Sequence, residues 1–463
     1  MTQTIQYDKN PSGEGAAARV SRAAATPTIS TDTGTGWPAL GSKSHKAVAT
    51  AVTICTTGLP NADRPAAAAG ELWSTQVTVR ALQACTIQAG LAFYGTLGAT
   101  LGTLRGTVTS AAVTFAAGEV KTLTIDGALA PALTASVDLQ VSRTIAGAPA
   151  IGDAFYVDKV TLTKTATSVP YRDPTTSPAA VWSGTADAST QVYYDPTVTV
   201  VPYEDDAPTP RVDITLTDLY PSALTVTVRQ ISAEGTVNVR DAIRKPDTAN
   251  AFFVTDYAVP PGIPVTYQAQ QYSATGAELG LTGTATTQVN FADPSTVVIQ
   301  DPLNAKNSVR VEAKSDFGGL VARKRDVQLY RRGSDTIALM GQMGLLEGVP
   351  LPVQTKTIAD AEKLTKVLAV SQVLVRSMPG YLRIPRCLHV VVGAPVESPV
   401  DVSWGGTWSV WPIVGDEVTP SEINSIASPL TYTRFKATYA TYTAAKLVYS
   451  TYLQAKQSPP PDI

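Results

Sequence analysis

The chain has 463 residues, of which 44% are hydrophobic and 16% are charged, and its formal net charge is -2. Packed cores are therefore possible, but no global basic field exists to hold nucleic acid or an anionic membrane, so neither partner is expected. Its three cysteines are too few for a disulfide framework and share no metal-ligand spacing, which is typical of a reducing compartment. The chain also has no Walker-type loop and no Rossmann glycine-rich turn, and we expect no cofactor.

The residue types favour a mostly β fold. The chain is rich in valine and threonine, which favour strands because a β-branched side chain fits a pleated surface. Its 33 glycines and 33 prolines supply many turns between such strands. At this length we expect several β-rich domains.

The first segment, residues 1–35, is polar and rich in small residues, and we interpret it as an N-terminal arm without a core of its own. Its opening sequence has no basic-then-apolar signal peptide pattern. No apolar run in the chain approaches the roughly 20 residues of a membrane span. We therefore expect a protein made in the cytoplasm that does not insert into membranes.

Residues 36–165 alternate apolar and polar side chains between turn signals. Val77 and Val79 share one face of a predicted strand, and Leu123 and Ile125 share another. In "DAFYVDKVTLTK", an apolar alternation over Phe155 and Val157 continues to Val160 and Leu162. Strict alternation means one buried and one wet face, which predicts an antiparallel β-sandwich.

Residues 166–207 are rich in Pro, Ser and Thr, and we interpret them as a structured connector. Alternation resumes over residues 208–294, where strands and turns predict an immunoglobulin-like or fibronectin type III-like sandwich. One face carries Val212, Ile214 and Leu216, and a second carries Leu224, Val226 and Val228. Tyr267, on the alternation Val265–Tyr267–Ala269, is the candidate anchoring tyrosine of this core.

Residues 295–420 predict a third β-rich domain with one helix. The stretches "SVRVEA", "DVQLYRR", "QVLVRSM" and "CLHVVVG" have the character of strands. Ile358, Ala361, Leu364 and Val367 recur at helical spacing, with acidic residues in the first turn, which predicts a short amphipathic helix.

Catalytic signals are weak. The chain has two histidines, His45 and His389, and we interpret both as structural, which disfavours histidine metal sites and serine–histidine chemistry. Cys387 and His389 would share a face of a strand, but no third orienting group follows. Asp153 and Asp158 fall on opposite faces of a strand and form no acid pair for glycoside hydrolysis. We predict that the protein is not an enzyme.

A basic cluster lies in "ARKRD" and "YRRG". It places Arg323, Lys324, Arg325, Arg331 and Arg332 close together. A patch for nucleic acid or lipid is one interpretation, but we favour a solvated strand edge whose charges prevent edge-to-edge aggregation.

Exposed aromatic side chains would be needed to bind a sugar. Trp73, Tyr94 and Tyr156 are the candidate glycan contacts of the first domain, although core packing explains each at least as well.

Residues 421–463 contain a ten-residue phrase written three times, "TYTRFKATYA TYTAAKLVYS TYLQAKQ". Ten residues do not match a whole number of helical turns, so we expect one short helix per copy, capped by Thr431, Thr441 and Thr451. Such helices need a packing partner, either the third domain itself or another chain. The candidate docking residues are the tyrosines and lysines of the repeats: Tyr432, Lys436, Tyr439, Tyr442, Lys446, Tyr449, Tyr452 and Lys456.

These repeats, together with three other stretches in a fixed order, resemble minor tail proteins of phages that infect actinobacteria. "GDAFYVDKVTLTK" looks like the last strand of the N-terminal jelly-roll of those proteins, which resembles a carbohydrate-binding module. "VPYRDPTTSPAAVWSGTADASTQVYY" is similar to their exit segment, except that Asp173–Pro174 stands where glycine is usual. "DPLN" then opens the third domain, before the repeats.

The resemblance implies a structural minor tail protein of the tail tip or baseplate, located in the virion and not an enzyme. It implies other tail-tip proteins as partners, assembly as a trimer or ring, and a jelly-roll that is either a scaffold or a contact for host envelope glycans. The alternative is an adhesion protein whose jelly-roll grips a polysaccharide as its main task. A glycan-cleaving tail enzyme is the third hypothesis, disfavoured by the missing acid pair.

Overall fold

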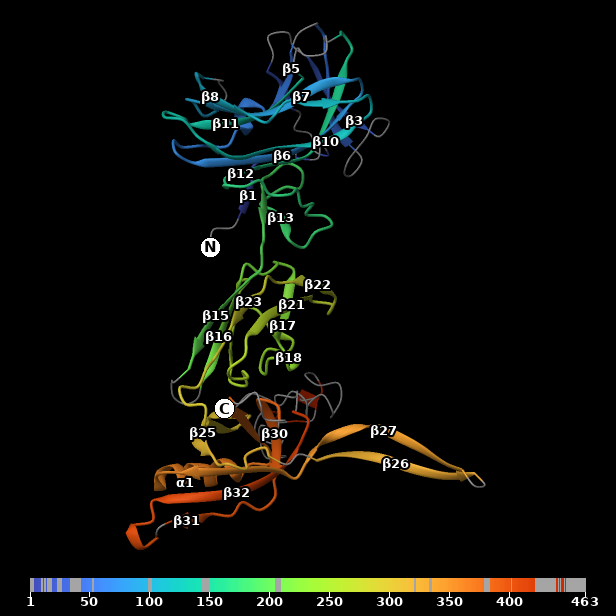
Figure 1. Ribbon diagram of the computed structural model, residues 1–463. Coiled ribbons are helices and arrows are strands. Elements are labelled where there is room, and N and C mark those ends of the chain that lie inside the picture. Colours follow the sequence, from blue (N-terminus) through green and yellow to red (C-terminus); the bar gives the residue numbers. More distant parts are fainter. Residues whose placement is uncertain are drawn as a thin grey trace. The chain divides into compact units, whose positions relative to one another are not determined.

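The computed structural model describes most of the chain, namely residues 4–9, 11, 14, 19–22, 27–33, 43–51, 54–98, 102–143, 150–204, 210–319, 322–332, 335–378, 384–400, 402–420, 439, 441, 443, 444 and 446. The protein is mostly β, as predicted, and divides into two compact units, Met1–Asp195 and Pro196–Ile463 (Figure 1).

The first unit is a jelly-roll sandwich of two antiparallel sheets, which enclose one apolar core. Its chain crosses repeatedly from one sheet to the other, which gives the jelly-roll connectivity. One sheet has the order β10 (Val120–Leu129), β6 (Leu72–Ala81), β12 (Ala154–Thr163), β1 (Thr4–Gln6), β14 (Gln191–Tyr193), β13 (Ala180–Trp182), with β4 (Lys43–Val48) on β12 and β3 (Thr28–Thr33) on β4. The facing sheet has the order β2 (Val20–Ser21), β5 (Cys55–Gly58), β11 (Ser136–Arg143), β7 (Cys85–Tyr94), β8 (Leu104–Thr109), with β9 (Val113–Phe115) on β7.

The N-terminal segment belongs to this sandwich and is not a separate arm. β1 pairs with both β12 and β14, β2 pairs with β5, and β3 pairs with β4. Part of the expected connector also joins the sheet, because β13 and β14 continue it through β1. Low hydrophobicity misled the prediction here, since backbone pairing with neighbouring strands, which needs few apolar side chains, joins β1, β2 and β3 to the sheets.

A β-bulge explains the irregular alternation of β12. The register shifts between Asp158 and Thr161, and Lys159 has a φ of 48°. Phe155 and Val157 before the bulge and Val160 and Leu162 after it are all buried. The extra residue therefore returns the apolar side chains to the same face of the strand.

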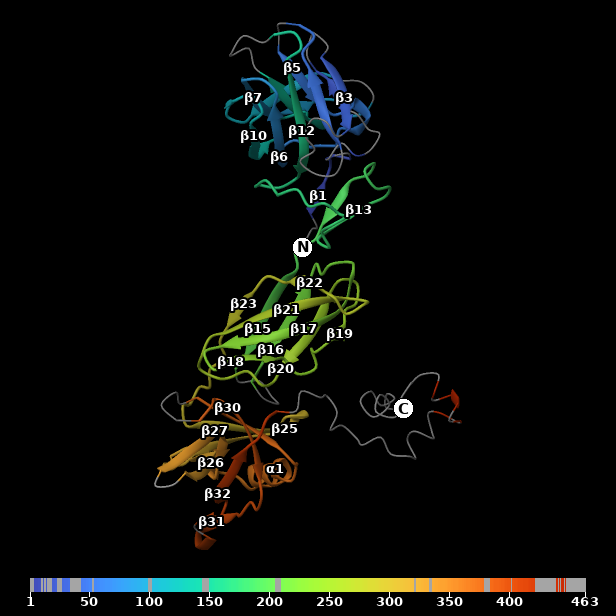
Figure 2. The same ribbon diagram turned by 90° about the vertical axis from the view of Figure 1, so that its right-hand side faces the viewer.

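The second unit begins with the predicted sandwich. Its first strand, β15 (Thr197–Tyr203), is formed by residues that were expected to belong to the connector. One sheet contains β15, β16 (Arg211–Thr217) and β20 (Phe252–Asp256). The other has the order β18 (Gly235–Asn238), β17 (Ala223–Ser232), β21 (Val265–Ser273), β22 (Glu278–Leu281), with β19 (Lys245–Pro246) on β17 and β23 (Ala285–Thr287) on β21. Figure 2 labels the strands of both sheets in the green and yellow part of the ribbon.

The apolar alternation predicted its core well. Val212, Ile214 and Leu216 are all buried, as is Tyr267. Leu224 is the exception, with 52% of its surface exposed. The register of β17 against β21 shifts between Ala223 and Thr225, so this bulge takes Leu224 off the buried face.

The third β-rich region is a closed antiparallel barrel. Its strands follow the order β28 (Val349–Thr355), β25 (Asn304–Ala313), β24 (Thr296–Asp301), β29 (Val373–Ser377), β30 (Cys387–Val392), β32 (Trp408–Glu417), and β32 pairs back with β28. The short β31 (Ser398–Val400) adds to β32. The predicted helix is confirmed as α1 (Ile358–Leu368), which is capped by Thr357 and packs Leu364 and Val367 into the core, whereas Ile358 is exposed.

A long two-stranded hairpin leaves this barrel. β26 (Ala322–Arg332) and β27 (Asp335–Glu347) pair with each other, and in the described part of the chain neither pairs with a third strand. In Figure 1 the hairpin extends well away from the barrel strands. Its base is held by two hydrogen bonds, from the Leu346 amide to Glu417 and from the Gly348 amide to Asp416, each 2.8 Å long.

Candidate functional site

The three candidate glycan contacts of the first unit are interior side chains. Trp73 has no exposed surface, and 6% of Tyr94 and 2% of Tyr156 are exposed. The Trp73 ring lies 5.1 Å from the ring of Tyr7, centroid to centroid. A sugar stacks on an open aromatic face, so the hypothesis of an aromatic platform built from these residues does not fit their positions.

Both tyrosine hydroxyl groups have partners within the fold. The Tyr156 hydroxyl donates to Asp32 over 2.7 Å, and burial together with this carboxylate raises the pKa of Tyr156 to about 12. The Tyr94 hydroxyl accepts a hydrogen bond from Gln140, and the Arg64 guanidinium lies over its ring. These contacts give both tyrosines a structural role.

The acidic residues weighed for glycoside hydrolysis do not converge. Asp158 is fully buried and its carboxylate accepts the amide of Lys159. Asp153 forms an ion pair with Arg143 and accepts the amide of Ala150. Each carboxylate thus serves the local fold.

The C-terminal repeats fall almost wholly outside the described residues, which is true of Tyr432, Lys436, Tyr442, Tyr449, Tyr452 and Lys456. Within the described part, the Thr441 hydroxyl accepts the amide hydrogen of Ala444 at 3.2 Å, which confirms the predicted cap of the second repeat. Lys446 is exposed and Tyr439 is half-buried.

The basic cluster lies on the projecting hairpin. Arg323 and Arg331 are exposed on β26, and so are Leu329 and Tyr330, at 66% and 51%. The sequence pattern predicted the strand and its charges. It did not indicate that the strand would stand away from the sheet.

A buried arginine joins the sandwich to the barrel within the second unit. Arg376 of β29 has no exposed surface. Its guanidinium donates to the backbone oxygen of Val259 over 3.1 Å from Nε and 2.8 Å from Nη2, and to that of Pro210 over 2.7 Å. Burial lowers the pKa of Arg376. Carbonyl groups of the sandwich thus solvate a cation that the barrel supplies.

The anchoring tyrosine of the sandwich lies close to this joint. The Tyr267 hydroxyl donates to Asp256 over 2.8 Å, and Gln230 donates to the same carboxylate over 2.7 Å. The other carboxylate oxygen accepts the amide of Ala258, also over 2.8 Å. Burial raises the pKa of Asp256. This network confirms Tyr267 as a core anchor.

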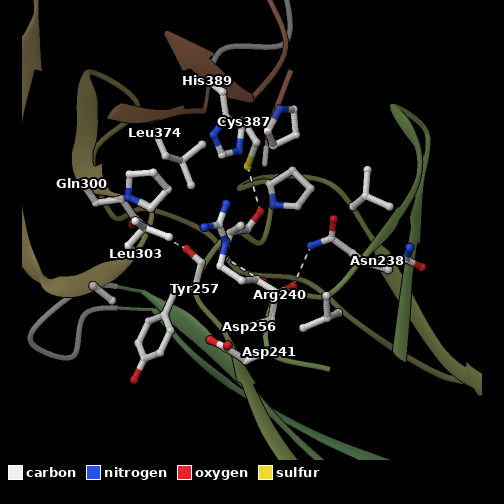
Figure 3. A pocket seen from close by; sticks show the side chains of 18 of the residues that line it. Asn238, Arg240, Asp241, Asp256, Tyr257, Gln300, Leu303, Leu374, Cys387 and His389 are labelled. Atoms are coloured by element: carbon white, nitrogen blue, oxygen red, sulfur yellow. Dashed lines mark hydrogen bonds between the residues drawn. The ribbon is translucent and has the colours of Figure 1, made fainter. Parts of the chain in front are cut away.

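A pocket of about 650 Å³ opens beside the joint. It is lined by segments that are distant in sequence: 234–241 and 255–260 of the sandwich, and 300–306 and 385–389 around the barrel strands. Figure 3 shows Arg240 reaching into the middle of this pocket, toward Cys387 and His389. Neither Arg240 nor Asp241 was singled out from the sequence, because they belong to a turn with no periodic signal.

Cys387 and His389 share a face of β30, as the strand prediction required, and both line the pocket. The Cys387 thiol donates to the backbone oxygen of Ala258, 3.0 Å away, and burial raises the pKa of this thiol to about 12. A thiol held protonated is a poor nucleophile. Burial thus disfavours the thiolate of Cys387, and the pair lines the pocket with polar groups.

Arg240 dominates the charge at this end of the pocket. Burial lowers its pKa, and the carboxylates of Asp241 and Asp301 offset part of that effect. In the described residues we find no hydrogen bond or ion pair of the Arg240 side chain. Burial, and then the charge of Arg240, lower the pKa of His389 to about 4, so its imidazole is neutral at pH 7.

Two other kinds of feature are absent from the part of the chain that the structure describes. Within it, no cluster of three or more His, Cys, Asp or Glu side chains has the arrangement of a metal site. None of the described helices has the length and apolar character that crossing a membrane requires.

Comparison with known proteins yields remote structural similarity alone. No protein family model matches the chain, and no curated protein sequence matches it. A Clostridium thermocellum endo-1,4-β-D-xylanase structure with CBM22-1 and GH10 modules, complexed with xylohexaose, is 12% identical with a TM-score of 0.26, and the match covers 35% of this chain and 28% of that one. The CBM22-2 xylan-binding domain of a Paenibacillus barcinonensis protein is 14% identical with a TM-score of 0.25, covering 35% and 98%.

The tripod from the baseplate of bacteriophage Tuc2009 is also among the matches, at 10% identity and a TM-score of 0.24, covering 55% of this chain and 83% of that one. The structural neighbours of this chain thus include carbohydrate-binding modules and a phage baseplate protein. Their TM-scores are too low to assign a function.

Proposed function

We propose that this chain is a structural, non-enzymatic component of the tail tip of a tailed phage, and that it assembles with further copies of itself. Two observations made on the chain support the proposal. The order of its segments, ending in the Thr-Tyr repeats, resembles phage minor tail proteins. Its second unit carries an element that calls for a partner, the hairpin of β26 and β27.

The hairpin is the observation that carries the assembly role. A two-stranded hairpin alone is marginally stable in water, and its outer edges offer backbone groups for pairing. This one presents Leu329 and Tyr330 to solvent, next to exposed Arg331. The exposed leucine and tyrosine supply the apolar contact area that an interface favours, and the arginine supplies hydrogen-bond donors. Leu329 and Tyr330 are consecutive in β26 and face opposite sides of the ribbon, so a neighbouring copy that covers either side buries apolar surface.

A glycan-gripping jelly-roll, the alternative function, has less support. Trp73, Tyr94 and Tyr156 are buried. Among the described residues, the first unit therefore offers no sugar platform at the predicted positions. Host attachment would rely on other surfaces of the protein.

Two experiments test the proposal. Quantitative mass spectrometry of purified phage particles should find this chain at a small fixed number of copies relative to the major tail-tube protein. Absence from particles, with the chain free in the lysate, would overturn the tail-tip proposal.

The second experiment tests the hairpin. Leu329→Asp together with Tyr330→Asp should reduce self-association in sedimentation velocity and reduce incorporation into particles. Leu224→Asp is the matched control, because Leu224 is similarly exposed but lies on the sandwich. Equal behaviour of the hairpin variant and the control would contradict the assembly role.

A further inference from the structure

The guanidinium of Arg240 reaches into the pocket of the second unit toward the imidazole of His389. Arg240 and His389 approach the pocket from different elements, the turn after β18 and the strand β30 (Figure 3). The charge of Arg240 reaches the imidazole, since it lowers the pKa of His389. The carboxylates of Asp241 and Asp301 raise the pKa of Arg240 and so offset part of the effect of burial.

Other acids that line the pocket are already bound within the fold. Glu234 accepts the backbone amide of Arg386 at 3.0 Å, and Glu417 accepts that of Leu346. The Asp256 carboxylate accepts hydrogen bonds from Gln230, Ala258 and Tyr267. Arg240 is a half-buried cation, and the carboxylates of Asp241 and Asp301 offset only part of its desolvation cost. An anionic group of a ligand beside Arg240 would remove that cost.

The other residues that line the pocket indicate the chemistry of the rest of the ligand. Asn238 supplies amide groups on one side, while Pro260, Leu303 and Leu374 supply apolar surface. The volume of about 650 Å³ exceeds that of a single small ion and is suited to a molecule of one to three sugar rings. A sugar combines hydroxyl groups with apolar C–H faces, which matches such mixed walls.

We infer that this pocket binds an acidic saccharide whose carboxylate lies between Arg240 and His389. The planar guanidinium can donate two parallel hydrogen bonds to a carboxylate. The neutral imidazole can donate one more from a ring nitrogen. The sugar rings then lie between Asn238 and Leu303, which flank Arg240 on opposite sides in Figure 3, and Leu303 is 42% exposed. This site goes beyond the proposed tail-tip role, because it would exist whether or not the chain is part of a virion.

The two histidines make the inference measurable in the full chain. His389 lines the pocket, whereas His45 is buried in β4 of the first unit. In protein labelled with ¹³C-histidine, titration with digalacturonate should move the NMR signal of His389 and leave that of His45 in place. The signals are assigned with His389→Gln. Digalactose and inorganic phosphate, titrated in parallel, separate a carboxylated sugar from a neutral sugar and from a simple anion.

Variants then locate the ligand. Arg240→Gln should weaken digalacturonate binding about tenfold or more in calorimetry, since a charge-assisted hydrogen-bonded pair is lost. Leu303→Trp should weaken binding by filling the outer part of the pocket, and it provides a second test if the first variant folds poorly. Arg244→Gln is the matched control, because Arg244 lies in the same sandwich but stacks on Tyr272 outside the pocket.

The outcomes are distinct. Selective binding of digalacturonate that is lost in Arg240→Gln and kept in Arg244→Gln supports the inference. Equal binding of digalactose, binding of phosphate alone, or no movement of the His389 signal at millimolar digalacturonate overturns it. Particle composition is a separate measurement, so failure here leaves the tail-tip proposal untouched.

Discussion

Buried and half-buried arginines have different kinds of partner in the two units. In the jelly-roll, Arg19 is 2.5 Å from Asp8 and Arg22 is 2.8 Å from Asp138, and in both pairs the side chains are at most 8% exposed. In the second unit, Arg376 is solvated by backbone carbonyl groups, and the half-buried Arg240 borders an open pocket.

The difference separates charges that hold a fold together from a charge that can hold a ligand. Asp138 also accepts the amide of Leu59 and the side chain of Gln140, so the Arg22–Asp138 pair is fully hydrogen-bonded in place. Such a pair has no capacity left for an external group. Among the described residues, no group accepts a hydrogen bond from the Arg240 guanidinium, and that makes Arg240 the better candidate for binding. Changing one side chain at a time tests this contrast.

The largest effect is expected at Trp73. Trp73→Ala removes the largest fully buried side chain of the jelly-roll, and we expect the free energy of unfolding of the first unit to fall by about 3 to 5 kcal/mol. Urea denaturation monitored by circular dichroism measures it. A well-folded variant with unchanged stability would mean that the ring is not in the core.

The Arg22–Asp138 pair comes next. Arg22→Gln leaves the Asp138 carboxylate buried without its cation, which should cost about 3 to 4 kcal/mol in the same denaturation assay. Lys121→Gln is the control, because its partner Glu119 is at the surface and such pairs contribute little. Similar losses in both variants would remove the distinction between paired interior charges and surface charges.

Acidification should destabilise the second unit through His389. Its pKa in the folded state is about 4, below the ordinary value of 6.5. Between these values the unfolded chain binds a proton that the folded chain does not, so the free energy of unfolding decreases as the pH falls from 6.5 to 4. The loss attributable to this group is about 2 to 3 kcal/mol.

Urea denaturation at pH 6.5 and at pH 4.5 checks this prediction. His389→Gln should show a smaller decrease than the unmodified chain, because glutamine does not titrate. An identical pH dependence of the two proteins would show that His389 is not shielded from solvent in the folded state.

The smallest effect on stability is expected at Arg240. Arg240→Gln removes a cation that forms no ion pair within the described residues, so we expect a change below about 0.5 kcal/mol in either direction. Thermal unfolding beside Arg22→Gln gives the comparison directly. A loss as large as that of Arg22→Gln would place Arg240 among the structural arginines and weaken its assignment to a ligand.

Much of the fold could be predicted from local pattern. Alternation identified the buried faces of Val77 and Val79 and of Val212, Ile214 and Leu216, and helical spacing identified α1. These predictions succeed because a strand or helix buries one side, and the period of its apolar residues records which side that is. Tyr267 was found in the same way, from its place on an apolar alternation.

Contacts between distant segments could not be predicted in this way. The bulges at Lys159 and Leu224 change which residues face inward, and they depend on the register with a partner strand. Closure of the barrel requires Val349 to pair with Gly415. The aromatic residues that were candidates for sugar binding are covered by parts of the chain far away in sequence. For example, the ring of Tyr7 packs against that of Trp73.

The same reason explains the candidate site. Cys387 and His389 could be placed on one strand face from their spacing, but their neighbours come from the sandwich at Asn238, Arg240 and Ala258. A pocket forms between elements that are distant in sequence, and the local order of residues does not indicate which elements will meet. Residue types and their periods thus decided the strands and their buried sides. The pairing of remote strands decided which polar groups were left facing a cavity.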